Sequence, residues 1–152
     1  MAKKIKAVVS INASATDVWN YLTNPVLMKR WMGEPEMNIE VITDWKVGKP
    51  ILIKGIHHVD FENKGTVLQF DPGKIIQYTH LSSISHLSDE NESYSVITFL
   101  LSALEKGTFL EIQVENFPTE SIYNHLAFYW HGTANVLKHV IERECNDTST
   151  FK

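Results

Sequence analysis

The sequence predicts an α+β fold in which a curved antiparallel sheet of about six to seven strands wraps around one long C-terminal helix. Two observations support this prediction. Residues 4–115 contain successive stretches in which apolar and polar side chains alternate, as in half-buried strands. Residues 118–144 instead repeat apolar side chains at helical spacing. A helix with a single apolar face must cover a surface, and the preceding strands can provide it.

The long helix is predicted from its two faces. Pro118 precedes it and Glu120 lies in its first turn, as is typical of a helix N-terminus. Phe128 falls opposite the apolar face, so we expect its side chain to be exposed. The apolar face consists of Ile122, Leu126, Tyr129, Trp130, Thr133, Leu137, Val140 and Ile141. The polar face carries Asn124, Asn135, Lys138, His139 and Glu142.

Two short helices are expected after the first strand, which covers residues 4–11. Ser14 stands three residues before Asp17, a spacing typical of a helix N-cap. The Asn24–Pro25 pair ends this helix, because the residue before a proline disfavours the helical conformation. A second short helix follows over residues 26–32.

The hairpin around residues 71–74 has a register that can be worked out. The Asp-Pro-Gly-Lys sequence there is typical of a tight turn. With its two central residues as the loop, Val67 pairs with Tyr78 and Gln69 pairs with Ile76.

The last hairpin is predicted from the Lys106–Gly107 pair, taken as a two-residue loop. This loop pairs Leu101 with Ile112 and Phe99 with Val114, and all four side chains are apolar. Turn chemistry and the alternation of side chains therefore predict the same register.

The properties of the whole chain fit one domain. Residues 1–145 of the 152 are expected to form it, with residues 146–152 as a frayed tail. The formal net charge of -4 argues against nucleic-acid binding. Cys145 is the only cysteine, which excludes an internal disulfide and favours a reduced, cytoplasmic protein. No apolar run approaches the roughly 18 residues of a membrane span.

Several segments, in their order along the chain, resemble a known family. One of them reads Ile-Asn-Ala-Ser-Ala-Thr-Asp-Val-Trp from residue 11 to residue 19. In this order they are similar to the START-like helix-grip (SRPBCC) superfamily, and most to the group related to the heat-shock protein 90 ATPase activator. The matching segments are residues 11–19, 22–25, 30–31, 65–67, 71–72, 76–80, 96–99, 107–108 and 110–112, followed by the last helix.

The resemblance implies a helix-grip fold with an apolar cavity between the sheet and the long helix. Members of the superfamily bind lipids, sterols, polyketides or other small apolar molecules, and a few catalyse cyclisation or hydrolysis. The group usually has Gly-Trp in the last helix, with a leucine four residues after the tryptophan. Here Gly132 is followed by Thr133, while Leu137 keeps the leucine position. Trp130 lies one turn earlier on the same face, so we expect it to fill the space.

The candidate ligand site is this cavity, with aromatic walls and with tyrosine hydroxyls and His80 as polar anchors. We expect an enclosed apolar pocket of roughly 300–1,000 Å³, and a solidly packed gap would contradict ligand binding. The alternative for each residue is ordinary core packing. The candidate lining residues are Trp31, Ile53, His57, Tyr78, His80, Phe99, Leu101, Ile112, Tyr123, Leu126 and Trp130.

The stability lost when Trp130 is replaced by alanine distinguishes core packing from a cavity wall. If Trp130 is ordinary core, its replacement by alanine should cost about 3–5 kcal/mol of stability. If it borders a cavity and is packed on one side only, the cost should be about 1–2 kcal/mol.

No metal, cofactor or catalytic motif is predicted. The chain has no HExxH sequence, no paired Cys/His spacing and no Gly-x-Ser-x-Gly motif. His57 and His58 are adjacent, so they should face opposite sides of a strand. His57 and His80 are assigned to the concave face, where bonding a buried carbonyl or a water is the favoured role.

The expected function is non-enzymatic binding of a small hydrophobic or aromatic molecule, lipid-like or polyketide-like. Two alternatives stay open: a chaperone-interacting protein resembling the activator, and a cyclase-like or hydrolase-like enzyme that uses the same cavity. Exposed Phe128 is a candidate homodimer contact, since symmetric dimers are common.

Overall fold

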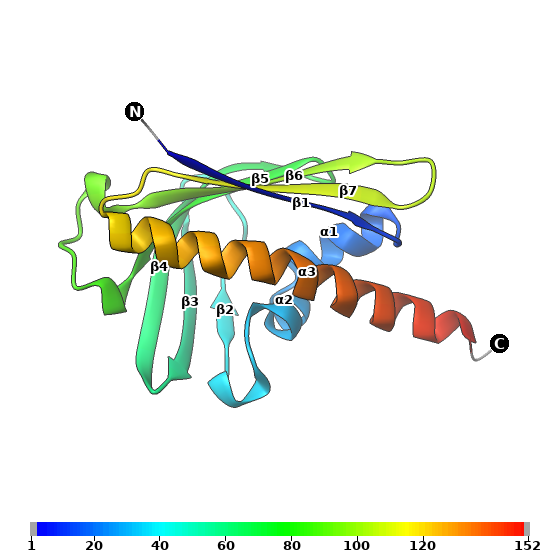
Figure 1. Cartoon of the computed structure of the whole chain (residues 1–152), viewed down its shortest axis with the longest axis horizontal. Coiled ribbons are helices and arrows are strands. Elements are labelled where there is room, and N and C mark those ends of the chain that lie inside the picture. Colours follow the sequence, from blue (N-terminus) through cyan, green and yellow to red (C-terminus); the bar gives the residue numbers. More distant parts are fainter. Residues whose placement is uncertain (1–2, 151–152) are drawn as a thin grey trace.

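The computed structural model describes the backbone of residues 3–150 and the side chains of residues 3–146. Within these residues a seven-stranded sheet, two short α-helices and one long helix are arranged as predicted for an α+β fold (Figure 1). In chain order the elements are β1 (Lys4–Ile11), α1 (Ala15–Thr23), α2 (Pro25–Met32), η1 (Pro35–Met37), β2 (Glu40–Ile42), β3 (Pro50–His57), β4 (Val59–Asp71), β5 (Ile75–Ser82), η2 (Ser83–Ser85), η3 (Asn91–Ser93), β6 (Ser95–Ala103), β7 (Thr108–Glu115) and α3 (Glu120–Thr150).

The sheet is antiparallel throughout, in the order β1-β7-β6-β5-β4-β3-β2. In Figure 1, β1, β7, β6 and β5 run along α3, whereas β4, β3 and β2 turn away and extend below it. This strong bend is the accumulated twist of neighbouring strands. It gives the sheet a concave face, and α3 lies against that face.

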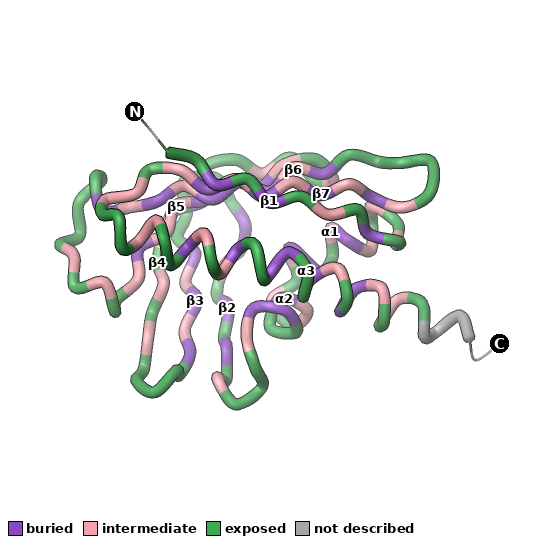
Figure 2. The backbone as a smooth tube through the Cα atoms, in the orientation of Figure 1, coloured by how far each residue is buried: buried purple, intermediate pink, exposed green. Residues whose placement is uncertain are grey.

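The apolar face predicted for the last helix is the face that α3 buries. Buried and exposed residues alternate along α3 in Figure 2. The helix continues to Thr150, so residues 146–150, predicted as a tail, are helical, and residues 151–152 lie outside the described part. No described helix is long and apolar enough to cross a membrane. The buried residues of α3 are Leu126, Trp130, Thr133, Ala134, Leu137, Val140 and Ile141.

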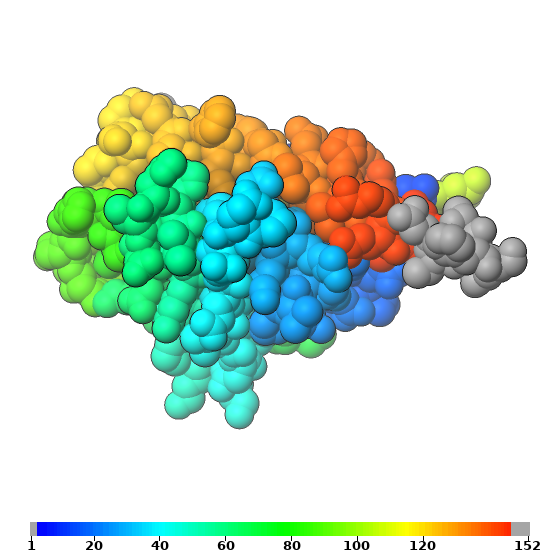
Figure 3. All heavy atoms as spheres, turned by 90° about the horizontal axis from the view of Figure 1, so that it is seen from below, coloured from blue at the N-terminus to red at the C-terminus, as the bar shows by residue number. Residues whose placement is uncertain are grey.

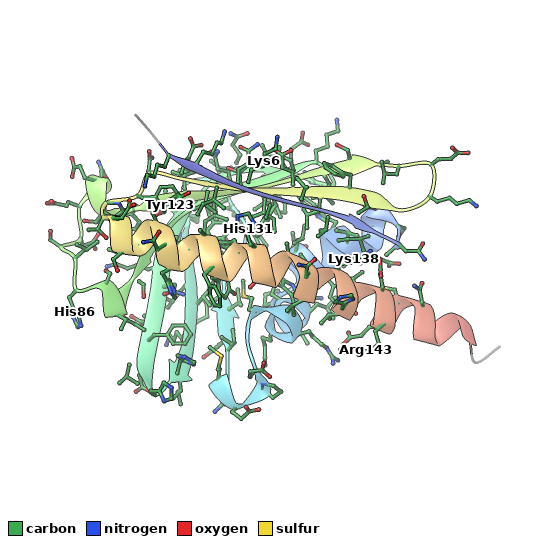
Figure 4. The ribbon with its side chains drawn as sticks, viewed as in Figure 1. Lys6, His86, Tyr123, His131, Lys138 and Arg143 are labelled. Carbon is green, nitrogen blue, oxygen red and sulfur yellow. The ribbon has the colours of Figure 1, made fainter. Side chains whose placement is uncertain are left out.

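Polar contacts also attach α3 to the edge of the sheet. At its start, Glu120 accepts a 2.6 Å hydrogen bond from the ammonium group of Lys3. Further along, the Lys138 ammonium group (Figure 4) donates to the Ser10 carbonyl oxygen at 2.6 Å. Such exposed contacts contribute little stability. The buried face of α3 therefore dominates its attachment.

The predicted helix starts are confirmed by their capping contacts. The Ser14 hydroxyl accepts a hydrogen bond from the Asp17 backbone N–H at 3.1 Å, which caps α1. The Asn24 side chain accepts from the Val26 N–H at 2.9 Å, which caps α2. The proline at position 25 is the first residue of α2, where its missing N–H is not needed.

The register of the β4–β5 hairpin is confirmed only in part. Val67 pairs with Tyr78 as predicted, but Gln69 pairs with Gln77 and not with Ile76. A β-bulge between Val67 and Gln69 inserts one extra residue into β4. The prediction was wrong beyond Val67 because turn chemistry alone does not reveal a bulge.

The predicted β6–β7 register is wrong by two residues. Phe99 pairs with Ile112 and Leu101 pairs with Leu110. The turn is centred on residues 105–106, one residue earlier than predicted, and a hydrogen bond from the Leu104 N–H to the Gly107 carbonyl oxygen closes it. A shift of two residues leaves every side chain on its predicted face, since strand side chains alternate. The core assignment therefore survives the error in register.

Candidate ligand-binding site

Phe99 of β6 lies at the centre of an aromatic cluster between the sheet and α3. Its ring centroid is 6.3 Å from that of Trp31, 6.2 Å from that of Tyr78 and 5.7 Å from that of Trp130. All three ring pairs meet edge to face, a favoured geometry for aromatic rings. These four residues come from α2, β5, β6 and α3, and none is more than 3% exposed. We call them the Phe99 cluster.

Other predicted lining residues share this core. His80 is half-buried on β5, two residues beyond Tyr78. Because strand side chains alternate, His80 and Tyr78 lie on the same face of β5. The aliphatic members that are buried in the same core are Ile53, Leu101, Ile112 and Leu126.

His57 and Tyr123 are placed away from the Phe99 cluster. His57 is exposed at the end of β3, and its ring contacts that of His58 at 4.8 Å. The left-handed backbone of His58, with φ of 68°, ends β3 there. Tyr123 is half-buried near the start of α3 (Figure 4), where its ring packs on Phe117 at 5.0 Å. His57 therefore does not face the interior, whereas Tyr123 packs against the core at a distance from the Phe99 cluster.

Two aromatic side chains near the cluster, buried Trp31 and half-buried Tyr129, have a protein partner for their polar atom. The Trp31 Nε1–H donates to the Tyr21 carbonyl oxygen at 2.8 Å. The Tyr129 hydroxyl donates to the Met32 carbonyl oxygen at 2.8 Å. The second contact ties α3 to the end of α2, next to the cluster.

Two members of the Phe99 cluster lack such a partner. Among the described residues, no hydrogen bond is made by the Tyr78 hydroxyl or by the Trp130 Nε1–H, although these side chains are only 2% and 3% exposed. In the same part of the chain, every side-chain nitrogen or oxygen that solvent cannot reach has a partner. The Tyr78 oxygen and the Trp130 nitrogen must therefore border space that a water molecule can enter.

The titratable groups near this space are uncharged at neutral pH. Burial, and then the neighbouring Tyr129, raise the pKa of Tyr78, and burial raises the pKa of Tyr129 to about 12. Although His80 keeps some exposure, desolvation by the surrounding protein, and then repulsion from His125, lower its pKa to about 4. Both phenols stay protonated, and the His80 imidazole stays neutral.

The lowered pKa of His80 predicts a loss of stability in acid. Below about pH 6.5, the usual pKa of histidine, the unfolded chain takes up a proton that the folded chain excludes. Stability should therefore decrease between about pH 6.5 and pH 4, by up to about 3 kcal/mol. Urea unfolding at pH 7.0 and pH 4.5, for the natural protein and for His80→Gln, measures this loss. We expect the variant to lose less stability on acidification, and equal losses would contradict the pKa assignment.

One buried aromatic residue near the cluster, Trp45, was not selected from the sequence. Trp45 contacts the ring of Tyr78 at 6.1 Å and stacks on Phe70 at 5.6 Å. It lies in a polar segment, and its positive φ of 58° follows no strand or helix pattern. Tyr129 was placed on the apolar face of the helix, but its bond to Met32 was not foreseen. A large aromatic residue isolated among polar neighbours is the one signal that pointed to Trp45.

A hollow lies elsewhere, on the outer side of α3. It has a volume of about 800 Å³ and is open to solvent. Figure 3 shows α3 along one edge of the molecule, beside the segments from η1 to β4. Phe128, which borders the hollow, is 85% exposed, as predicted for its side of the helix. None of the residues predicted to line the cavity borders this hollow.

In the part of the chain that the structure describes, no three histidine, cysteine, aspartate or glutamate side chains are grouped so that they could hold a metal ion.

Comparison with known protein families gives a match over most of the chain. The family model described as "Activator of Hsp90 ATPase homolog 1-like protein" matches residues 12–142. No curated protein matches the chain significantly.

Solved structures with the same fold extend this match. A protein from Cytophaga hutchinsonii, solved in solution, is 34% identical, with a TM-score of 0.78 over 96% of this chain and 99% of that one. The Aha1 dimer from Colwellia psychrerythraea is 20% identical, with a TM-score of 0.72 over 92% of this chain and 96% of that one. DynU16, a protein in the dynemicin biosynthetic locus, is 15% identical, with a TM-score of 0.71 over 91% of this chain and 47% of that one. At such identities the last two show the fold alone.

Proposed function

The chain belongs to the family of activator of Hsp90 ATPase homolog 1-like proteins, and on this premise we propose that it binds a small, largely apolar molecule between the sheet and α3. The observation that carries the proposal is a pair of donors on nearly buried side chains, the Tyr78 hydroxyl and the Trp130 Nε1–H, which have no partner among the described residues and border space that water can enter. A ligand that displaces this water must supply an acceptor, because an unpaired donor shut off from water costs about 1–3 kcal/mol. A bound molecule would supply the missing partners and cover the aromatic walls.

The composition of this region supports the same proposal. Ligand pockets are mostly apolar and have a few well-placed polar groups. The rings of the Phe99 cluster supply the apolar surface, and Tyr78, Trp130 and His80 supply the polar groups. The occurrence of the same fold in a protein of a biosynthetic locus, DynU16, fits a role with small molecules.

Native mass spectrometry of the purified protein tests this function. We expect a bound organic molecule whose mass is lost when the protein is denatured. Phe128→Ser is the matched control, because it removes the exposed aromatic side chain of the outer hollow and leaves the Phe99 cluster unchanged. The bound mass should persist in this variant. Its disappearance there would place the molecule on the outer side of α3 and contradict the proposal.

We propose that the outer side of α3 is occupied by a second copy of the chain. Phe128 projects into solvent there, while Gly132, one turn later, leaves open space, since an added Cβ would meet nothing within 4 Å. In a two-fold pair, Phe128 of each copy can enter the notch that Gly132 leaves in the other. Residues 121–137 contain no aspartate, glutamate, lysine or arginine, so no formal charges oppose this contact. The fold neighbour from Colwellia psychrerythraea was solved as a dimer.

Sedimentation of the natural protein and of Phe128→Asp tests the dimer. We expect a dimer that the substitution converts to a monomer, because two buried carboxylates would face each other without counter-ions. Val26→Asp, on the exposed side of α2, is the control and should remain dimeric. A dimer that survives Phe128→Asp would contradict this contact. A natural protein that is monomeric and is captured by Hsp90 would instead favour the chaperone partner that the family description suggests.

A further inference from the structure

We infer that the molecule bound at the Phe99 cluster is uncharged and carries a hydrogen-bond acceptor, a ketone or hydroxyl oxygen, that faces the Tyr78 hydroxyl and the Trp130 Nε1–H. The inference rests on the proposed function and names the chemical class of its ligand. It follows from which polar atoms in the core are paired and which are not.

Five tyrosine and tryptophan side chains are buried in the described part of the chain, and three of them have their polar atom paired. Tyr21 donates its hydroxyl hydrogen to Glu144 at 2.6 Å. The Nε1–H groups of Trp31 and Trp45 donate to backbone carbonyls at 2.8 Å and 2.7 Å. The two unpaired groups, those of Tyr78 and Trp130, both belong to side chains that contact the ring of Phe99. Both unpaired donors therefore belong to side chains of the Phe99 cluster.

The chemistry of these two groups specifies an acceptor. An indole N–H can only donate, and a phenol O–H donates while its oxygen can also accept. The hydroxyl of Tyr78 keeps its proton, because burial raises its pKa. A ligand oxygen with free lone pairs satisfies either donor, whereas a pure hydrocarbon satisfies neither.

The surroundings also exclude a charged ligand. Among the described residues, the buried polar side chains are only serines and threonines, so no buried counter-ion is available. His80, two residues beyond Tyr78 on β5, is neutral above about pH 4. A carboxylate or an ammonium group held here would lose its hydration without gaining an opposite charge, which is far more costly than burying a neutral polar group.

Three probes of nearly the same shape test the inference: 2-acetylnaphthalene, 2-isopropylnaphthalene and 2-naphthoate. They present a ketone, a hydrocarbon and a carboxylate on the same ring system. Equilibrium dialysis gives their dissociation constants for the natural protein, for Tyr78→Phe and for Tyr21→Phe. Thermal unfolding of each ligand-free variant shows that it is folded.

We expect Tyr78→Phe to weaken binding of the ketone by about tenfold, which corresponds to the loss of one hydrogen bond. The affinity for the hydrocarbon should not change. Tyr21→Phe should change neither affinity but should lower the unfolding temperature, because its hydroxyl is bonded to Glu144. Tyr78→Phe should not lower that temperature, because no bond is lost. The carboxylate should bind at least about tenfold more weakly than the ketone, since it is buried without a partner.

Several results would overturn the inference. If Tyr78→Phe changes the dissociation constants of the ketone and the hydrocarbon by the same factor, the hydroxyl does not recognise the ligand. The apolar binding site would still stand. If the carboxylate binds as tightly as the ketone, the ligand need not be uncharged. If none of the three probes binds, the proposed function itself fails and the inference fails with it.

Discussion

Trp31→Ala should lower the free energy of unfolding by about 3–5 kcal/mol, the usual cost of removing a large buried ring. Trp31 is 2% exposed and meets the rings of Phe99 and Trp130 at 6.3 Å and 6.4 Å. The substitution also leaves the Tyr21 carbonyl oxygen without its donor. It therefore combines a cavity with a lost buried hydrogen bond.

Urea unfolding followed by circular dichroism measures this loss. Trp19→Ala is the control, because Trp19 is only half-buried and has a single ring contact, with Phe70 at 5.3 Å. It should cost clearly less than Trp31→Ala. Equal losses at the two positions would show that the Phe99 cluster is not the packed centre of the core.

Gly65→Ala should be the second severe change, with an expected loss of about 3 kcal/mol or more, at the upper end for an overpacked site. A Cβ at Gly65 would lie 1.7 Å from the carbonyl oxygen of Thr79 and 2.5 Å from its carbonyl carbon. These are backbone atoms of β5, so no side chain can move aside. The two strands would have to separate where Thr66 and Thr79 are hydrogen-bonded.

Gly132→Ala is the control for this prediction, and it should raise the free energy of unfolding instead of lowering it. An added Cβ at Gly132 meets nothing within 4 Å, and the residue lies inside α3. Alanine is favoured over glycine in a helix by about 1 kcal/mol, so this variant should be more stable. Both variants should be compared by urea unfolding at concentrations where the chain is monomeric. A tolerated Gly65→Ala would mean that β4 and β5 are not as close as described.

The sequence was sufficient to predict the elements whose signals are local. The Ser14 and Asn24 caps are each visible within a few residues. The buried face of α3 follows from helical spacing alone. The register errors came from features without such a signal, namely the bulge after Val67 and the turn centred on residues 105–106 instead of 106–107. The two-residue error in the last hairpin leaves the side chains on their predicted faces, whereas the bulge in β4 places Phe70, and not Gln69, on the core face with Val67.

The candidate site was harder to predict, because it depends on which polar atoms find partners across the fold. Spacing placed Tyr78 and Phe99 on the interior face, but it could not show that Tyr78 lacks a partner while Tyr21 has one. His57 was assigned to the concave face because it alternates correctly along its strand. The strand ends there, so alternation no longer determined the direction of its side chain.

Trp130 combines the properties of a core residue and of a cavity wall. The size of the loss on replacement by alanine was expected to distinguish a core residue from a cavity wall. In the structure, three rings contact Trp130, yet its Nε1–H has no partner among the described residues. A large loss is therefore compatible with a residue that also borders a ligand, and stability alone cannot decide its role.

A crystal structure of the protein saturated with 2-acetylnaphthalene tests the central claim most directly, because it locates the bound molecule. We expect the ketone between the sheet and α3, with its oxygen about 2.7–3.2 Å from the Tyr78 hydroxyl or the Trp130 Nε1. The rings around Phe99 should move apart only as far as the probe requires. A probe found beside Phe128 on the outer side of α3, with the Phe99 cluster closed and unchanged, would contradict the claim.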